Sequence, residues 1–232
     1  MSLKPPKKSD MGKSWMKGRQ DRVKRIQPEY HLIVTEGTKT EPAYFEAIKN
    51  EINRRHPQKI QLQIEGAGLN TVSLFEKAKA LVAISPNVYK HVWIVYDTDD
   101  FPAEHINEVQ NLCEINSNEE TEYHTLWSNQ CIELWFLLHF CYFQSDVSRN
   151  EYFPKLSQLM CAQGLDAYRK NREDMYQVLF PYMETAIANA KRLAAKNEGK
   201  TPAESAPGTE VYRLVEKLKP YLLEESAFAK KI

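Results

Sequence analysis

Three acidic residues stand directly after two apolar, β-rich runs of the sequence. Glu36 follows residues 30–35, and Asp97 and Asp99 follow residues 91–96. In an extended chain, residues i and i+2 point to the same side. Carboxylates ~5 Å apart repel by roughly 3 kcal/mol at an effective dielectric near 20. A hard divalent cation such as Mg²⁺ or Mn²⁺ removes this cost, so a metal site is one interpretation of the pattern. The alternative is a solvated turn that caps the next helix.

Glu36 belongs to the same cluster if its strand lies beside the strand of Asp97. The glycine that follows it, Gly37, lets the backbone turn sharply or lets a ligand approach closely. Three carboxylates at one rim suit metal-assisted phosphoryl chemistry. Lys39 and Thr40 stand next to this position and could contact a phosphate; the alternative is a solvated lysine and a helix cap. For Glu36 itself, the alternative is an exposed turn residue.

Further candidates lie close to these motifs or in a third apolar block. Glu41 is either first-turn helix charge or a partner of the site residues, and Asp100 is either a third metal ligand or a helix cap. Glu133 lies in the first turn of a strongly apolar helix, where a buried carboxylate without a partner is costly. We therefore expect Glu133 to meet a basic group or to face the metal crevice. His139 in the same helix is interpreted as a core histidine.

The spacing of apolar residues predicts an alternation of strands and helices, followed by a mostly helical C-terminal region. Strands separated by helices imply βαβ units, a mainly parallel central sheet and helices on both faces. Ligands of such sheets bind beyond the carboxyl ends of the strands, where Glu36 and Asp97 are placed. The predicted strands are residues 30–35, 59–65, 91–96 and 122–127, and the predicted helices are about 40–56, 70–84, 102–115, 130–140, 148–162, 181–197 and 211–218.

The composition is that of a globular protein. The chain has 232 residues, 42% of them hydrophobic and 27% charged, which excludes a collagen, a coiled-coil rod and a wholly disordered chain. No apolar run reaches the roughly 18 residues of a membrane span, and we expect no secretion signal because the N-terminal residues lack its short apolar core. The four cysteines are widely spaced, which argues against a zinc ribbon and a disulfide scaffold. We therefore expect a cytoplasmic protein.

The net charge of zero hides an asymmetry. Residues 1–25 contain nine basic and two acidic side chains, a net charge of +7, and several prolines and glycines. We interpret residues 1–27 as a flexible basic arm, which could hold a polyanion or could be a solvated tail. The expected division of the remainder is an α/β core over residues 28–128 and a helical extension packed on it over residues 129–232.

Three blocks in this order resemble the RloB-like family. They are TEGTKTEPAYF at 35–45, VWIVYDTDDF at 92–101 and SNQCIELWFLLHF at 128–140, and the likeness covers about residues 28–218. The order strand–Glu36, strand–Asp97-x-Asp99 also looks like a Toprim domain. One departure is Gln130, which stands where the family pattern has proline; we expect it to affect the start of the helix more than the chemistry.

The resemblance implies a Toprim/Rossmann-like three-layer α/β sandwich. Toprim domains occur in topoisomerases, primases and nucleases that use Mg²⁺, with the glutamate as general acid/base and the aspartates on the metal. Carried over by position, these roles fall to Glu36, Asp97 and Asp99.

The family is associated with phage defence and restriction-modification. The implied activity is a Mg²⁺-dependent (or Mn²⁺-dependent) phosphodiester hydrolase, a nuclease acting on DNA or RNA, with an ATPase or other defence component as a further partner and no membrane. The alternatives are a non-catalytic, metal-containing binding or regulatory module and a nucleotidyl transferase.

Overall fold

The structure is a computed structural model that describes residues 27–98 and 102–222. Residues 1–26 of the expected basic arm, Asp99 and Asp100 lie outside the described residues. Within these two ranges, no helix is both long and apolar enough to cross a bilayer.

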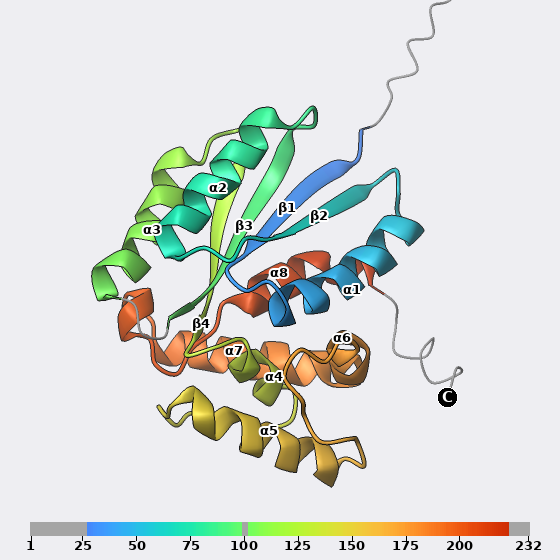
Figure 1. Ribbon diagram of the computed structural model, residues 1–232, viewed down its shortest axis with the longest axis vertical. Coiled ribbons are helices and arrows are strands. Elements are labelled where there is room, and N and C mark those ends of the chain that lie inside the picture. The colour runs from blue at the N-terminus through green and yellow to red at the C-terminus, as the bar shows by residue number, and fades with distance from the viewer. Residues whose placement is uncertain (1–26, 99–101, 223–232) are drawn as a thin grey trace, which may run out of the picture.

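Four parallel strands form the central sheet (Figure 1). They are β1 (Glu29–Thr35), β2 (Ile60–Gly66), β3 (Tyr89–Thr98) and β4 (Glu122–Asn129), in the order β2-β1-β3-β4. The predicted α/β fold with a parallel sheet is therefore confirmed. The strand of alternating pattern, β2, lies at an edge, and the most apolar strand, β3, lies in the interior, as its burial on both faces requires.

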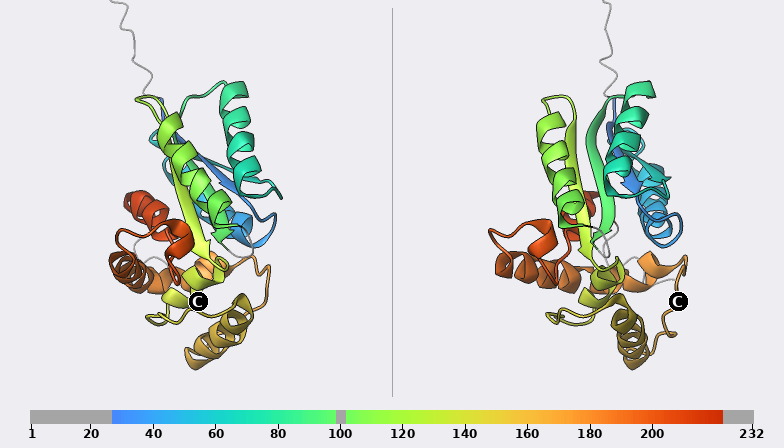
Figure 2. Two further views of the ribbon diagram at one scale, coloured as in Figure 1. Left: turned by 90° about the vertical axis from the view of Figure 1, so that its left-hand side faces the viewer. Right: turned by 60° about the vertical axis from the view of Figure 1, so that its left-hand side comes forward.

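Helices cover both faces of the sheet and make a three-layer sandwich (Figures 1 and 2). The helices α2 (Thr71–Ile84) and α3 (Ala103–Asn116) pack on one face, against Leu32 of β1. The other face, which includes Ile33, packs against α1 (Thr40–Arg55) and α8 (Val211–Leu218). Successive residues of a strand thus pack into the two hydrophobic cores on opposite faces of the sheet. For this reason the strands are continuous apolar runs in the sequence.

The strand order reverses between β1 and β3. The chain leaves β1 through α1 to reach β2 on one side, and it returns through α2 to β3 on the other side of β1. At such a reversal the flanking connections diverge to opposite faces and leave a crevice beyond the carboxyl ends of the two strands. In this fold, that crevice lies directly after Thr35 and Thr98.

The helical C-terminal region gathers at the carboxyl end of the sheet (Figures 1 and 2). The predictions for 148–162 and 181–197 match α5 and α7, whereas α6 was not predicted. These helices share one hydrophobic core with α1 and the sheet. The domain boundary expected between residues 128 and 129 stays a prediction. The helices are α4 (Glu133–Leu138), α5 (Arg149–Ala162), α6 (Met175–Leu179) and α7 (Met183–Lys196), with single 3₁₀ turns at Phe180–Tyr182, Pro202–Glu204 and Lys219–Tyr221.

The start of α4 differs from the prediction. A helix was expected from residue 130, but α4 begins only at Glu133 because Gln130 has a φ of 64°. Proline, the residue of the family pattern, is held near −65° and cannot adopt this left-handed conformation. The Gln130 side-chain carbonyl accepts a hydrogen bond from the Arg149 backbone N–H at 3.2 Å, which satisfies a free donor at the start of α5.

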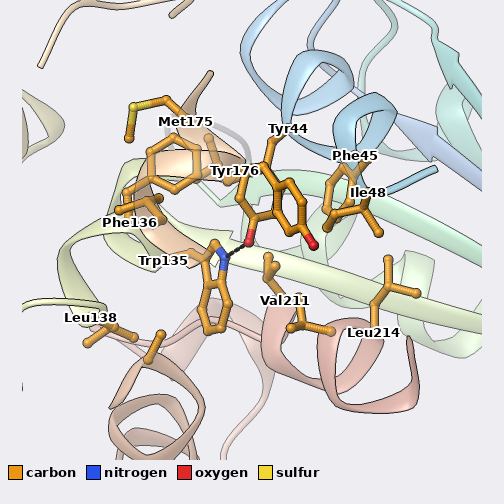
Figure 3. Close-up of a cluster of buried hydrophobic side chains, with 14 of the residues drawn as sticks. Tyr44, Phe45, Ile48, Trp135, Phe136, Leu138, Met175, Tyr176, Val211 and Leu214 are labelled. Carbon is orange, nitrogen blue, oxygen red and sulfur yellow. Dashed lines mark hydrogen bonds between the residues drawn. The ribbon is translucent and has the colours of Figure 1, made fainter. Parts of the chain in front are cut away.

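A buried aromatic cluster fixes α4 against α1 (Figure 3). The Trp135 indole N–H donates a hydrogen bond of 3.0 Å to the Tyr44 hydroxyl oxygen. The Tyr44 ring in turn packs against Phe136 of α4 and Tyr176 of α6, with centroids 5.4 and 5.9 Å away. Because rings of this kind are rigid and fully buried, the cluster sets the position of the first turn of α4 relative to the first turn of α1.

Candidate functional site

Glu36 and Asp97 meet at the crevice between β1 and β3. The Glu36 backbone N–H donates to the Val95 carbonyl at 2.8 Å, which continues the parallel ladder one residue beyond β1. The Glu36 carboxylate oxygen Oε2 then accepts a hydrogen bond from the Asp97 backbone N–H at 3.3 Å. Two acids that are 61 positions apart in the sequence therefore lie side by side, at the strand reversal.

These two acids line a pocket of about 660 Å³. Its walls come from the start of α1, the loop after β2, the first turn of α4, the first turns of α5 and the loop before α6. The candidates Glu36, Lys39, Glu41, Asp97 and Glu133 all line this one pocket. The remaining lining residues are Gly37, Thr38, Thr40, Gly68, Leu69, Asn70, Cys131, Ile132, Arg149, Phe153, Lys170 and Asn171.

The charges of the pocket are separated by depth. Glu41 and Glu133 are only 9% and 2% exposed, whereas Lys39 and Lys170 are exposed. Burial raises the pKa of Glu41, and the negative charge of Glu133 raises it further, while Lys170 acts in the opposite direction. The pocket thus has an acidic floor, in which carboxylates repel one another, and a basic rim.

The carboxylate of Glu133 has a neutral partner. The Tyr168 hydroxyl donates a hydrogen bond of 2.6 Å to Glu133 Oε1 and thereby compensates part of the cost of burying this carboxylate. Burial, followed by the charges of Glu133 and Asp97, raises the pKa of the Cys131 thiol. The thiol is therefore protonated at neutral pH, which excludes Cys131 as a thiolate nucleophile.

Two glycines shape the floor of the pocket, because another residue at either position would clash or be strained. A Cβ on Gly37 would lie 2.0 Å from Glu41 Oε2, so the Glu41 carboxylate occupies the space that any other residue at position 37 would fill. Gly68 has a φ of +64°, and its N–H donates to the Glu36 carbonyl at 3.0 Å. This hydrogen bond holds the loop after β2 against the Glu36–Gly37 turn. The loop can adopt this conformation because glycine has no side chain and tolerates a positive φ.

The basic and polar residues contributed by the helical region were not predicted. Arg149, Lys170 and Asn171 follow the third apolar block by 9 to 31 positions and belong to no motif next to Glu36 or Asp97. The Thr40 hydroxyl donates to Asn171 Oδ1 at 3.1 Å, so Thr40 ties the start of α1 to this loop, while Lys39 occupies the N-cap position. The run of basic residues at 169–172 is the one sequence signal that could have indicated the rim.

His139 is buried in the core, as interpreted from the sequence, and lies outside the pocket. It is 1% exposed, and its Nδ1–H donates to the Trp135 carbonyl at 2.9 Å. In the described part of the chain, its Nε2 is the one buried side-chain nitrogen or oxygen without a hydrogen-bond partner. Burial lowers the pKa of His139 to about 3, so the ring is neutral.

The donor set of the pocket fits a hard cation. Carboxylate oxygens are the ligands that Mg²⁺ and Mn²⁺ prefer, and Mg²⁺ keeps several waters when one or two carboxylates bind it. Glu36 and Asp97 are half-buried at the open side of the acidic floor. Burial is the main cause of the raised pKa of Glu41, and a bound cation would reduce the smaller contribution from the charge of Glu133.

One protein-family description, "RloB-like protein", matches residues 31–218. The chain belongs to the RloB-like family. The matched range runs from β1 to the last residue of α8, and it includes every residue that lines the pocket. Neither a curated protein nor a solved structure matches the chain.

Proposed function

We propose that this RloB-like protein is a Mg²⁺-dependent phosphodiester hydrolase, a nuclease that acts in bacterial defence. The observation that carries the proposal is the contact between Glu36 and Asp97 at the strand reversal, within a pocket of acidic floor and basic rim. An acidic floor suits a divalent cation, and a basic rim suits the phosphates of a nucleic acid.

Four of the lining residues, together with Asp99, have a role in this proposal. Glu36 takes the proton of the attacking oxygen or returns one to the leaving oxygen. Mg²⁺ held by Asp97, Asp99 and Glu36 would neutralise the charge that develops on the phosphoryl group. Lys39 and Lys170, which are exposed at the rim, hold the phosphate by charge-assisted hydrogen bonds.

The surroundings of the rim support a polyanionic substrate. Lys170 stands in a loop with Arg169 and Arg172, and this loop lines a neighbouring surface pocket. Arg172 is paired with Asp174, so Arg169 and Lys170 are the cations of this loop that would raise the local concentration of nucleic acid, and the basic N-terminal arm would add to them. Both DNA and RNA fit this chemistry, and an ATPase or another defence component would be a further partner.

A reducing, cytoplasmic location is part of the proposal. All four cysteines are free thiols, two of them buried in the cores. Disulfides are rare in the cytosol because the redox systems there keep thiols reduced, so free cysteines fit this compartment.

The test compares the cleavage of single- and double-stranded DNA, RNA and tRNA with Mg²⁺, with Mn²⁺ and with a chelator. The variants are Glu36→Gln and Asp97→Asn, with Glu65→Gln as the matched control at the carboxyl end of the edge strand. The amide oxygen of glutamine can still accept the Asp97 N–H, so folding should survive Glu36→Gln. We expect Glu36→Gln to lose about 10²–10⁴-fold in rate, the usual range for a general base. Asp97→Asn should lose rate because it weakens metal binding, and the control should keep its rate.

Two outcomes would count against the proposal. If the wild-type protein cleaves and both site variants cleave equally well, then the site assignment is wrong. If the wild-type protein is stabilised by Mg²⁺ but cleaves none of the substrates, the non-catalytic binding module is favoured instead.

A further inference from the structure

A second cluster of metal-ligand side chains lies at the opposite end of the sheet from the pocket. The first residues of β3 and β4 place His91 opposite Glu122 in the strand register, with His124 two residues later on the same face of β4. The ligand atoms of these three residues lie within 4.8 Å of one another. From this arrangement we propose a transition-metal site, of the Zn²⁺ class, on the amino ends of β3 and β4.

The distances between the three donor atoms fit one small ion. His91 Nδ1 lies 3.0 Å from His124 Nε2 and 3.3 Å from Glu122 Oε2, and His124 Nε2 lies 3.7 Å from the same oxygen. An atom about 2.0 Å from all three corners sits close to the centre of this triangle, and Zn²⁺ binds imidazole nitrogen and carboxylate oxygen at about 2.0–2.2 Å. Little movement of the side chains is therefore needed, and a fourth position stays open for water.

The hydrogen bonding of the two rings is compatible with a metal ion. Imidazole binds a metal ion through the lone pair of its neutral form. Neutral rings 3.0 Å apart share one hydrogen bond, in which one ring donates N–H to the other. If His91 is the donor, ligation at its Nδ1 only requires the proton to move to Nε2.

A partner for that relocated proton is already in place. Glu29 Oε1 lies 3.6 Å from His91 Nε2, so a small approach makes the carboxylate–histidine–metal arrangement that orients metal-binding histidines. Glu29 is itself held by His31, whose Nε2–H donates to Glu29 Oε1 at 2.8 Å. His31 Nδ1 accepts the Trp93 indole N–H at 3.2 Å, so both ring nitrogens of His31 are used and His31 orients Glu29 rather than binding the ion.

The donor atoms, rather than the neighbouring charges, select the kind of ion. Lys90 Nζ lies 3.3 Å from Glu122 Oε1, which leaves Oε2 as the oxygen nearest the rings. Arg213 and Lys217, on α8, place positive charge near His124, which weakens the attraction for any cation. A hard ion such as Mg²⁺ gains little here, whereas Zn²⁺, Co²⁺ and Ni²⁺ bind imidazole nitrogen strongly. This site is thus chemically distinct from the carboxylate pocket and does not depend on the proposed nuclease function.

The test is a titration of the tag-free full chain with Zn²⁺ by calorimetry and with Co²⁺ by visible absorption. Excess Mg²⁺ is present to occupy the carboxylate pocket, and Cys161→Ser removes an exposed thiol. The site variants are His124→Gln and Glu122→Gln, whose side chains are 29% and 42% exposed and so tolerate substitution. The controls are His105→Gln and Glu120→Gln, at exposed positions outside the cluster.

We expect one ion per chain, at least tenfold weaker binding in both site variants, and unchanged binding in both controls. Glu29→Gln should weaken binding about 10–100-fold, as the loss of such a supporting carboxylate does elsewhere. The proposal is overturned if the wild-type chain shows no saturable binding of Zn²⁺ or Co²⁺, or if His124→Gln binds as tightly as the wild-type chain.

Discussion

Acid should weaken the fold through His139, and His139→Asn should remove that part of the pH dependence. The ring is 1% exposed and its Nε2 has no partner among the described residues. A protonated ring would place an unpaired N–H⁺ in the core, which is the physical cause of its pKa of about 3. The unfolded chain has no such restriction, and its histidines titrate near pH 6.5.

The sign and size of the effect follow from these two values. Above pH 6.5 both states hold the neutral ring, so His139 contributes no pH dependence. As the pH falls below 6.5, the unfolded state binds a proton that the folded state cannot, and the free energy of unfolding decreases. The decrease is about 2 kcal/mol at pH 5, and it grows by about 1.4 kcal/mol per further pH unit until pH 3 is reached.

The assay is urea unfolding of the wild-type protein, His139→Asn and His105→Asn at pH 7.5 and pH 5.0. Asparagine can still donate to the Trp135 carbonyl but does not titrate, so the variant should lose about 2 kcal/mol less than the wild-type protein between the two pH values. The other histidines are unchanged in this comparison, and the exposed control should behave as the wild-type protein does. Equal pH-dependent losses in all three proteins would refute the reasoning.

Two further predictions concern the floor of the pocket. Tyr168→Phe should destabilise the fold by about 1.5–3 kcal/mol in urea unfolding at pH 7.5, because the buried Glu133 carboxylate loses its 2.6 Å hydrogen bond; an unchanged stability would mean that water replaces the hydroxyl. Glu41→Gln should raise the melting temperature without metal, because it removes a buried charge whose pKa is raised, and should reduce the stabilisation by Mg²⁺; a lowered melting temperature without metal would contradict this.

The strands and the principal acids of the pocket could be predicted because their signals are local. Each of the two apolar runs is followed directly by an acidic residue, Glu36 or Asp97. A parallel sheet then places these two residues at the same edge. Their direct contact required one further condition, that β1 and β3 be neighbours, and the ladder from Tyr30–Tyr89 to Thr35–Val95 meets it. Asp99, the third acid of the prediction, lies outside the described residues and stays a prediction.

The remaining features depend on contacts that the sequence does not mark. Lys170 enters the rim only because the loop before α6 crosses the start of α1, where Thr40 holds Asn171. The late start of α4 depends on the left-handed backbone conformation of Gln130. The sequence does not indicate this conformation, because glutamine has no preference for it. His91 and His124 stand 33 positions apart, and only the register of β3 with β4 brings their rings to 3.0 Å.

The two ends of the sheet differ in the donors they present, and this difference has a consequence for metal binding. At the carboxyl ends, Glu36, Asp97 and side chains of the nearby helices supply carboxylate oxygens to one pocket, which suits Mg²⁺. At the amino ends, residues within the strands supply imidazole nitrogens at distances set by the sheet itself, which suits Zn²⁺. Because imidazole sites bind Zn²⁺ more strongly than Mg²⁺, metal carried through purification should occupy the amino-end site first. The proposed nuclease activity should therefore respond to added Mg²⁺ whether or not His124→Gln has emptied the amino-end site. A joint loss of zinc binding and of this response would mean that the two ends are coupled through β3.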